Sequence, residues 1–262
     1  MEISTVTAAY FSPTDTTKKT VEAIARGILP SAVSLDLTLP AARAQDYSFG
    51  PQDLLVIGAP VYGGRIPVQA EEAIRRIHGS CTPVVLAAVY GNRAYEDALL
   101  ELRDLLSCQG FIPVAAGAFI GEHSFGNVIA AGRPDGEDLA KCADFGRKIA
   151  FWLSQSSLGD FSLQLSGGYP YKARGPQSGI AHEISKDCIH CMHCVEVCPT
   201  GAISPKSPAI KDMSRCIKCQ ACAKKCPKSA RIVPGGFVET MVQKLSAMCG
   251  EGRKEPEFFL GR

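Results

Sequence analysis

Eight of the twelve cysteines lie between Cys188 and Cys226, in two segments that share one pattern. Each segment reads C-x2-C-x2-C-x3-C-P, and the second begins at Cys216. Three cysteines at this spacing can place their thiolates at three corners of a 4Fe-4S cluster, while the cysteine before the proline ligates the other cluster of a pair. The pattern therefore predicts two 4Fe-4S clusters whose ligand sets cross between the segments.

The predicted crossing gives each cluster four thiolate ligands. One set consists of Cys188, Cys191, Cys194 and Cys226, and the other consists of Cys198, Cys216, Cys219 and Cys222. Two structural zinc sites are the alternative, because paired C-x2-C units also bind zinc. Zinc needs only two such pairs per ion, which leaves the third cysteine and the repeated Cys-Pro unexplained. The pattern therefore favours the two clusters.

Residues 183–233 resemble a bacterial-type two-cluster ferredoxin through these two motifs. The resemblance implies a small α+β domain that transfers electrons. Nine Lys or Arg residues stand against four Asp or Glu residues in this segment. A basic rim suits a redox partner protein with an acidic docking face, and ordinary solvated lysines are the alternative.

Further residues suited to chemistry lie in three loops of the first half of the chain, each after an apolar segment. The first loop joins closely spaced hydroxyls to a helical pattern, and such groups at a helix N-terminus can hold a phosphate. An ordinary helix cap is the alternative. The second and third loops combine glycines, which allow close approach of the backbone, with tyrosine rings that can face a planar ligand. Together the loops predict a site for FMN.

The predicted FMN contacts are Ser12, Pro13, Thr14, Asp15, Thr16, Thr17, Ala59, Pro60, Val61, Tyr62, Gly63, Gly64, Tyr90, Gly91, Asn92 and Tyr95. Simple packing is the alternative role for Tyr62 and Tyr95. His123 is a weak candidate for proton donation to a reduced flavin or a substrate, and an ordinary loop histidine is the alternative. The sequence contains no G-x-G-x-x-G motif, so a Rossmann-type nicotinamide or FAD site is unsupported.

Strand and helix patterns alternate from the N-terminus to about residue 154. Apolar, β-branched runs predict strands at Ile3–Tyr10, Val33–Leu37, Leu54–Ala59, Val84–Val89 and Val114–Ile120. Helical spacing predicts helices at Thr17–Ile28, Val68–Ile77, Tyr95–Cys108 and Glu137–Leu153. This alternation predicts an α/β fold, in which a doubly wound five-stranded parallel sheet binds its ligand at the carboxyl ends of the strands.

Residues 1–154 resemble a flavodoxin, because Ser12, Thr14 and Thr17 fall where the flavodoxin phosphate loop, T/S-x-T-G-x-T, has its hydroxyls. The resemblance implies FMN as the cofactor and a strand order of 2-1-3-4-5. Asp15 stands where that loop has glycine. Its carboxylate is expected to weaken FMN binding, although aspartate tolerates a left-handed backbone better than most residues.

The remaining segments complete the expected domain organisation. Residues 155–182 are rich in Ser, Gly and Pro and are interpreted as a linker between the domains at 1–154 and 183–233. Alternating apolar side chains could dock this linker on a domain: Phe161, Leu163, Leu165, Tyr169 and Tyr171. Residues 234–262 form a tail, in which Phe237 to Gly250 has the spacing of a short amphipathic helix.

Composition excludes several classes of protein. The 262 residues are 46% hydrophobic and 21% charged with a net charge of +2, which argues against disorder, a basic nucleic-acid-coating protein and an acidic solvating tail. No apolar stretch approaches the ~18–20 residues that span a bilayer. The N-terminus lacks the pattern of an export signal, and clustered cysteines indicate metal binding in a reducing compartment, so we expect a cytoplasmic protein.

The combination of the two domains resembles the flavodoxin–ferredoxin fusion proteins of anaerobic bacteria and archaea. The resemblance implies an electron-transfer protein of anaerobic metabolism, in which FMN exchanges two electrons and each cluster exchanges one, with redox partner proteins at one or both ends. The first alternative is an FMN-dependent reductase of a small substrate that its own clusters supply with electrons. The second is a redox sensor or scaffold without turnover.

Overall fold

The first part of the chain folds around a six-stranded sheet in the computed structural model, which describes residues 2–125, 128–157, 159, 161–175, 179–233, 235–249 and 252–261. Five strands run parallel to their neighbours: β1 (Thr5–Tyr10), β2 (Val33–Asp36), β4 (Asp53–Pro60), β6 (Thr82–Tyr90) and β7 (Phe111–Ile120). The sheet order is β10-β7-β6-β4-β1-β2. Its parallel strands therefore have the predicted flavodoxin-like order of 2-1-3-4-5.

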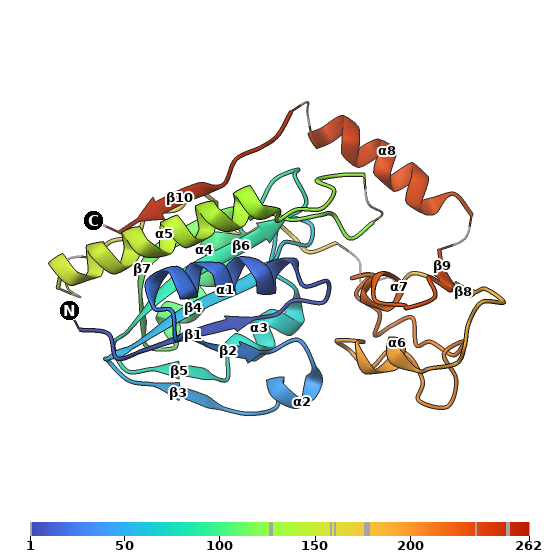
Figure 1. The fold of residues 1–262 in the computed structure, drawn as a ribbon, viewed down its shortest axis with the longest axis horizontal. Helices are drawn as coiled ribbons and strands as arrows, with labels where there is room; N and C mark the ends of the chain where they lie inside the picture. The colour runs from blue at the N-terminus through green and yellow to red at the C-terminus, as the bar shows by residue number, and fades with distance from the viewer. Residues whose placement is uncertain are drawn as a thin grey trace.

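Helices cover both faces of this sheet (Figure 1). Helices α1 (Thr16–Ile28) and α5 (Gly136–Gln155) pack on one face, and α3 (Val68–Ile74) and α4 (Ala98–Cys108) pack on the other. A Cβ on Gly27 would lie 2.2 Å from the Ala143 carbonyl oxygen, so glycine is needed where α1 crosses α5. The central strands β4 and β6 are almost wholly apolar because each is buried from both sides, whereas the edge strand β2 is largely exposed.

The structure corrects two predicted helix boundaries. The helix predicted over Val68–Ile77 ends at Ile74, and Ile77–Gly79 forms β5, which pairs with β3 (Tyr47–Phe49) in a separate small sheet. Ile77 is buried at helical spacing from Ile74, so apolar periodicity could not separate the two elements. The helix predicted from Tyr95 begins at Ala98. The short helix α2 (Pro40–Arg43), which precedes β3, was not predicted.

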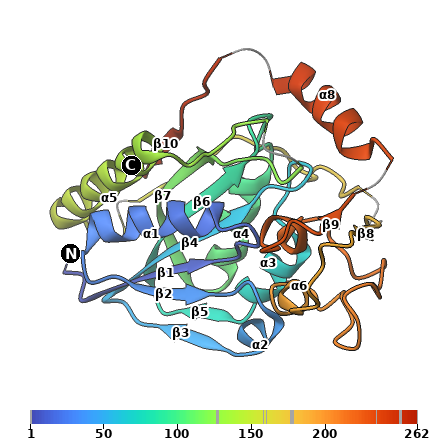
Figure 2. The same cartoon turned by 45° about the vertical axis from the view of Figure 1, so that its right-hand side comes forward.

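The cysteine-rich region is a small unit beyond the carboxyl ends of the parallel strands (Figures 1 and 2). It contains the antiparallel pair β8 (Glu183–Ile184) and β9 (Arg231–Ile232), with helices α6 (His193–Glu196) and α7 (Ala221–Lys224) between them. The two cysteine segments repeat the same backbone, with a left-handed residue at each corresponding position: His190 and Lys218, then Met192 and Gln220. The sequence repeat is therefore a repeat of backbone conformation.

The predicted linker lies along α4. The two carboxylate oxygens of Asp97 accept the backbone N–H groups of Gly168, at 3.0 Å, and Lys172, at 2.6 Å. Of the predicted apolar anchors, Leu163 is buried in the core, whereas Tyr169 is 66% exposed and contacts Asp104 through its hydroxyl. Residues 176–178 of the linker lie outside the described residues. Hydrogen bonds to α4 thus hold much of the linker.

The tail returns from the small unit to the sheet. Helix α8 (Phe237–Cys249) agrees with the helix predicted there, and it precedes β10 (Glu257–Leu260), which pairs with β7 in the antiparallel sense. The predicted sheet lacked this strand, since four residues carry too little periodicity to identify it. Within the described ranges, no helix is long and apolar enough to cross a membrane.

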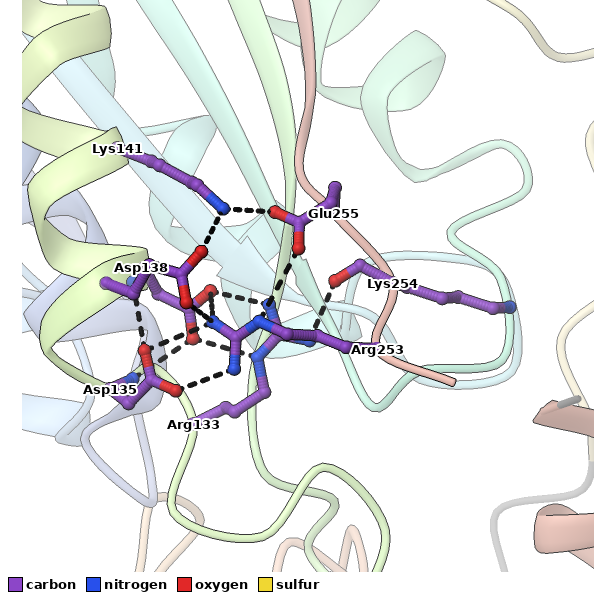
Figure 3. A network of polar contacts seen from close by, with 8 residues as sticks. Arg133, Asp135, Asp138, Lys141, Arg253, Lys254 and Glu255 are labelled. Atoms are coloured by element: carbon purple, nitrogen blue, oxygen red, sulfur yellow. Dashed lines mark hydrogen bonds and ion pairs between the residues drawn. The ribbon is translucent and has the colours of Figure 1, made fainter. Parts of the chain in front are cut away.

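A cluster of ion pairs fixes the tail beside β10 (Figure 3). Arg133 makes two bonds to the Asp138 carboxylate, at 2.8 and 2.5 Å, and donates a third to the carbonyl of Lys254 at 2.8 Å. Arg253 in the tail pairs with both Asp138 and Asp135. Arg133 and Asp138 are 6% and 5% exposed, so this pair is shielded from water.

We predict that Arg133→Ala lowers the free energy of unfolding by about 3 kcal/mol, because it leaves the buried Asp138 carboxylate without its main partner. Thermal unfolding should record a fall of about 5–10 °C in the midpoint. Arg147→Ala is the control. It removes an exposed ion pair with Asp144 in α5, the helix that also holds Asp138, and should leave the unfolding midpoint unchanged. Equal effects of the two substitutions would contradict this account of the tail.

Candidate functional site

A cavity of about 390 Å³ lies at the carboxyl ends of the parallel strands. Half of the sixteen predicted FMN contacts line it, namely Thr14, Thr16, Pro60, Val61, Tyr62, Gly63, Tyr90 and Gly91. The other half do not line it: Ser12, Pro13, Asp15, Thr17, Ala59, Gly64, Asn92 and Tyr95. All three predicted loops therefore meet at one cavity, and the loop after β7 joins them with Gly121 to Phe125.

The first loop has the form of an anion cradle at the start of α1. Ser12 Oγ accepts the backbone N–H of Lys18 at 2.9 Å, and the Ser12 N–H donates to Thr38 Oγ1 at 2.9 Å. Asp15 adopts a left-handed backbone with φ of 64°, the conformation for which flavodoxins use glycine. Thr17 Oγ1 is buried and has no hydrogen-bond partner among the described residues. An unpaired buried hydroxyl beside this loop fits a phosphate ligand.

An ion pair with α4 holds the second loop in place, through Arg65 of the loop and the buried Glu101. Arg65 makes two bonds to the Glu101 carboxylate, at 2.8 and 2.7 Å, and Glu101 is 2% exposed. Arg174 of the linker also donates to Glu101, at 2.6 Å, and lines the cavity. Burial raises the pKa of the Tyr62 phenol well above its usual range, and the nearby Cys219 thiol raises it further. The second loop thus faces the cysteine-rich unit.

Tyr95 does not line the cavity. Its hydroxyl donates to the Glu257 carboxylate in β10 at 2.8 Å, and its ring packs 5.7 Å from that of Tyr90. Tyr95 thus makes packing contacts in this structure, while Tyr90, which is also a predicted FMN contact, lines the cavity. The sequence pattern could not separate the two because the partner strand β10 is distant in the chain.

His123 is half-buried and lines the cavity against the third loop. A Cβ on Gly91 would lie 2.4 Å from His123 Cδ2, so the ring and the Gly91 backbone are in close contact. Nδ1 accepts the backbone N–H of Phe125 at 3.1 Å, which requires an unprotonated Nδ1. Burial, and then the nearby Lys224, lower the pKa of His123 to about 4. His123 is therefore neutral near pH 7 and poorly suited to donate a proton.

Cysteines from the two segments lie near one another in the structure. Cys198, Cys216, Cys219 and Cys222 line one cavity. In the other group, burial raises the pKa of the Cys194 thiol, and the nearby Cys226 and Cys188 thiols also raise it. Within the part of the chain that the structure describes, no three His, Cys, Asp or Glu side chains lie close enough to hold a single metal ion.

The two cysteines that precede proline have matching environments. Cys198 Sγ accepts the backbone N–H of Ala202 at 3.2 Å, and Cys226 Sγ accepts that of Ala230 at 3.3 Å. Hydrogen bonds to sulfur stabilise a thiolate and adjust the potential of a cluster that it binds. The two cysteines thus have the same local stabilisation, as suits thiolates that ligate iron–sulfur clusters.

The two cysteine groups differ in burial. In the group with Cys198, the three cysteines of the second segment are each 8% exposed. In the other group, Cys191 is exposed and the remaining members are half-buried. Ile217 and Lys218, which lie between two buried cysteines, also line the cavity at the sheet edge. We call Cys198, Cys216, Cys219 and Cys222 the inner group. Cys188, Cys191, Cys194 and Cys226 form the outer group.

Polar contacts that the sequence analysis did not identify join the small unit to the edge of the sheet. Lys225 Nζ lies 2.8 Å from Asp15 Oδ1, and Lys224 pairs with Glu122. Arg43 donates to the carbonyl of Pro199 at 2.7 Å. In the sequence these residues are ordinary surface charges, and only their partners, which are distant in the chain, give them a role.

Comparison with known proteins finds a family match in the cysteine-rich unit. Residues 187–230 match the family described as the 4Fe-4S dicluster domain. No curated protein matches the chain.

Several solved structures are similar to the N-terminal part. A flavodoxin from the domain Archaea shares 14% identity over 58% of this chain and 99% of its own, with a TM-score of 0.40. Oxidised flavodoxin 1 from Bacillus cereus shares 18% identity over 59% of this chain and 100% of its own, with a TM-score of 0.40. Rubredoxin oxygen:oxidoreductase from the anaerobe Desulfovibrio gigas shares 14% identity over 59% of this chain and 37% of its own, with a TM-score of 0.39.

The chain thus joins a flavodoxin-like fold, which its sheet order defines, to a 4Fe-4S dicluster domain. This is the combination that the sequence predicts.

The depressed pKa of His123 predicts a pH-dependent contribution to stability. The unfolded chain takes up a proton near pH 6.5 and the folded chain only near pH 4, so stability falls as the pH drops through this window. His123→Gln, whose side-chain oxygen can still accept the Phe125 N–H, removes this penalty. We expect its unfolding free energy to gain up to about 2 kcal/mol on wild type between pH 7 and pH 5.

Thermal unfolding at a series of pH values measures this gain. His78→Gln is the matched control, because His78 is exposed on β5, and its profile should parallel that of wild type. Parallel profiles for His123→Gln and wild type would show that His123 is not held neutral by the fold.

Proposed function

We propose that this chain transfers electrons between one FMN and two 4Fe-4S clusters, and so connects a two-electron carrier with one-electron carriers. The segment from Cys216 to Cys219 is the observation that carries the proposal. Ile217 and Lys218 line the cavity at the sheet edge, while the cysteines on either side line the thiol cavity. Electron tunnelling requires closely spaced centres, and a shared wall of a few residues supports such a spacing.

The residues around the first cavity would hold FMN by its phosphate and its ring system. The Thr17 hydroxyl and the backbone N–H groups at the start of α1 suit the phosphate. Tyr62 and Tyr90 supply aromatic surface from two loops, and the close contact of Gly91 with His123 fixes the third loop. FMN would supply the ability to accept two electrons together or one at a time.

The inner and outer groups would act in series. The inner group, Cys198 with Cys216, Cys219 and Cys222, adjoins the flavin cavity. The outer group includes the exposed Cys191, which supports electron exchange with other proteins at that end. One FMN hydroquinone releases two electrons, and two clusters that each accept one electron can take both. The number of electrons that the flavin would release therefore equals the number that the two clusters of the same chain would accept.

A reductase that acts on a small substrate is the competing function. Its substrate would have to reach the flavin through a cavity that is also lined by Arg174 of the linker, by Lys218 and by Met241 of α8. These residues from three separate segments cover the ring site with protein, which favours electron exchange within the chain over a substrate at the flavin. The neutral His123 also weakens the assignment of a proton donor.

The partners are expected to be redox proteins of the cytoplasm, where thiols stay reduced. Six of the nine basic side chains of the cysteine-rich unit already have partners: Lys211, Arg215, Lys218, Lys224, Lys225 and Arg231. Lys186, Lys206 and Lys228 are exposed and leave a smaller basic surface for an acidic partner. Ile189, which is 58% exposed beside Cys188, adds an apolar contact at the outer group.

Cofactor content tests the proposal directly. The protein purified without oxygen should contain about eight iron atoms, about eight sulfide ions and one FMN per chain, as iron, sulfide and flavin analysis of a single sample would show. Iron without flavin, even after FMN is added, would contradict the proposed function. Zinc in place of iron would contradict the cluster assignment.

Two cysteine substitutions test the order of the centres. Cys198→Ala should remove the inner cluster and slow electron transfer between FMN and the outer cluster by at least tenfold. Cys226→Ala, the matched change in the other segment, should remove the outer cluster and leave transfer between FMN and the inner cluster intact. Iron analysis and stopped-flow absorbance of the reduced flavin measure both effects.

The reversed result, in which Cys226→Ala but not Cys198→Ala isolates the flavin, would contradict the proposed order. Rapid oxidation of the reduced flavin by a small substrate in both variants would instead support the reductase.

A further inference from the structure

Asp15 is the one residue of the phosphate loop whose chemistry opposes a phosphate. It occupies the position at which the similar flavodoxin loop has glycine, and its neighbours Thr14 and Thr16 both line the cavity. A carboxylate here adds negative charge beside a ligand that itself carries about −1.5 to −2. The carboxylate can also compete for the backbone N–H groups of α1, since aspartate is among the preferred N-cap residues.

The Asp15 side chain does not cap the helix. Asp15 is the N-cap residue of α1, yet it makes no capping hydrogen bond with its carboxylate. The carboxylate instead pairs with Lys225 Nζ at 2.8 Å. Asp15 and Lys225 are separated by most of the chain, so this contact exists only when the cysteine-rich unit lies against the sheet. The pair is 47% and 27% exposed, which places it at the rim of the interface.

We propose that Lys225 is a positioning residue for FMN, supplied to the phosphate loop by the cysteine-rich unit. By pairing with Asp15, it neutralises the carboxylate and keeps it away from the N–H groups at the start of α1, which are then free for the phosphate. Lys225 acts through Asp15 and is not itself part of the cavity lining. The inference deepens the proposed function, because it rests on FMN occupying this cavity.

The neighbouring contacts fix the position from which Lys225 reaches Asp15. Lys224, the preceding residue, pairs with Glu122 and donates to the carbonyl of His123 at 3.1 Å. Glu122 and His123 both line the cavity. Two consecutive lysines at the end of α7 therefore hold two different loops of the flavin site. One neutralises a carboxylate in the phosphate loop, and the other closes the loop after β7.

The proposal distinguishes ligands with and without a phosphate. Riboflavin has the same ring system as FMN and no phosphate. Removal of Lys225 should therefore weaken FMN binding and leave riboflavin binding unchanged. Removal of Asp15 should abolish the need for Lys225, because glycine adopts the left-handed backbone at this position without strain and brings no charge.

The experiment measures dissociation constants of FMN and riboflavin by flavin fluorescence. It uses the full-length, cluster-containing chain freed of flavin, as wild type, Lys225→Ala, Asp15→Gly and the double variant. We expect Lys225→Ala to bind FMN about tenfold more weakly, with no change for riboflavin. In the Asp15→Gly background, the same lysine substitution should have no effect on FMN.

Two controls separate this role from general effects. Lys206→Ala removes an exposed lysine elsewhere in the same unit and should bind FMN as wild type does. Lys225 directly precedes the expected ligand Cys226, so iron content is measured in every variant to detect loss of a cluster. It should be equal in all of them. Lys225→Arg should retain most of the FMN affinity, since it restores the positive charge.

Three results would overturn the inference: unchanged FMN affinity in Lys225→Ala, equal losses for FMN and riboflavin, or the same loss in the Asp15→Gly background. Equal losses would mean that Lys225 only holds the two domains together. Failure of the wild-type chain to bind either flavin would overturn the proposed function itself, and is thus distinguishable from failure of the role of Lys225.

Discussion

Attachment of the cysteine-rich unit to the sheet at both of its ends is the constraint on which the proposed function depends. On the N-terminal side, the linker is bonded along α4 through Asp97. On the C-terminal side, α8 leads into β10, which extends the main sheet beside β7. A unit tethered once could swing away from the sheet edge. Two tethers restrict it to the carboxyl ends of the strands, where Ile217 and Lys218 complete the cavity wall.

The tethers and the interfacial ion pairs have different physical roles. Exposed or partly exposed ion pairs contribute little to stability, because water and salt screen them. The pairs of Lys224 and Lys225 therefore set the position of the small unit on the sheet, whereas strand pairing by β10 and the contacts of Arg133 and Asp138 with the tail residues Lys254 and Arg253 hold the tail there. The position of the small unit at this edge fixes the spacing of the proposed redox centres. Contacts that are weak but directional are sufficient to fix that position.

The sequence predicts most of the sheet and the grouping of the cysteines, because both depend on short-range patterns. Buried parallel strands are continuously apolar, and the two cysteine motifs repeat within a single segment. The features that it misses all depend on partners far apart in the chain. Strand β10 is defined by β7, the packing of Tyr95 by Glu257, and the role of Lys225 by Asp15. Asp15 shows the limit most clearly, since in isolation it only weakens a phosphate site.

The distribution of burial also limits where electrons can enter and leave. At the carboxyl edge of the sheet, the cavity between the loops is also lined by Ile217 and Lys218 of the cysteine-rich unit and by Met241 of α8. The outer group keeps an exposed cysteine, Cys191, and an exposed apolar neighbour, Ile189. Under the proposed function, a protein partner would therefore exchange electrons at this end, and the flavin would hold two electrons inside the chain.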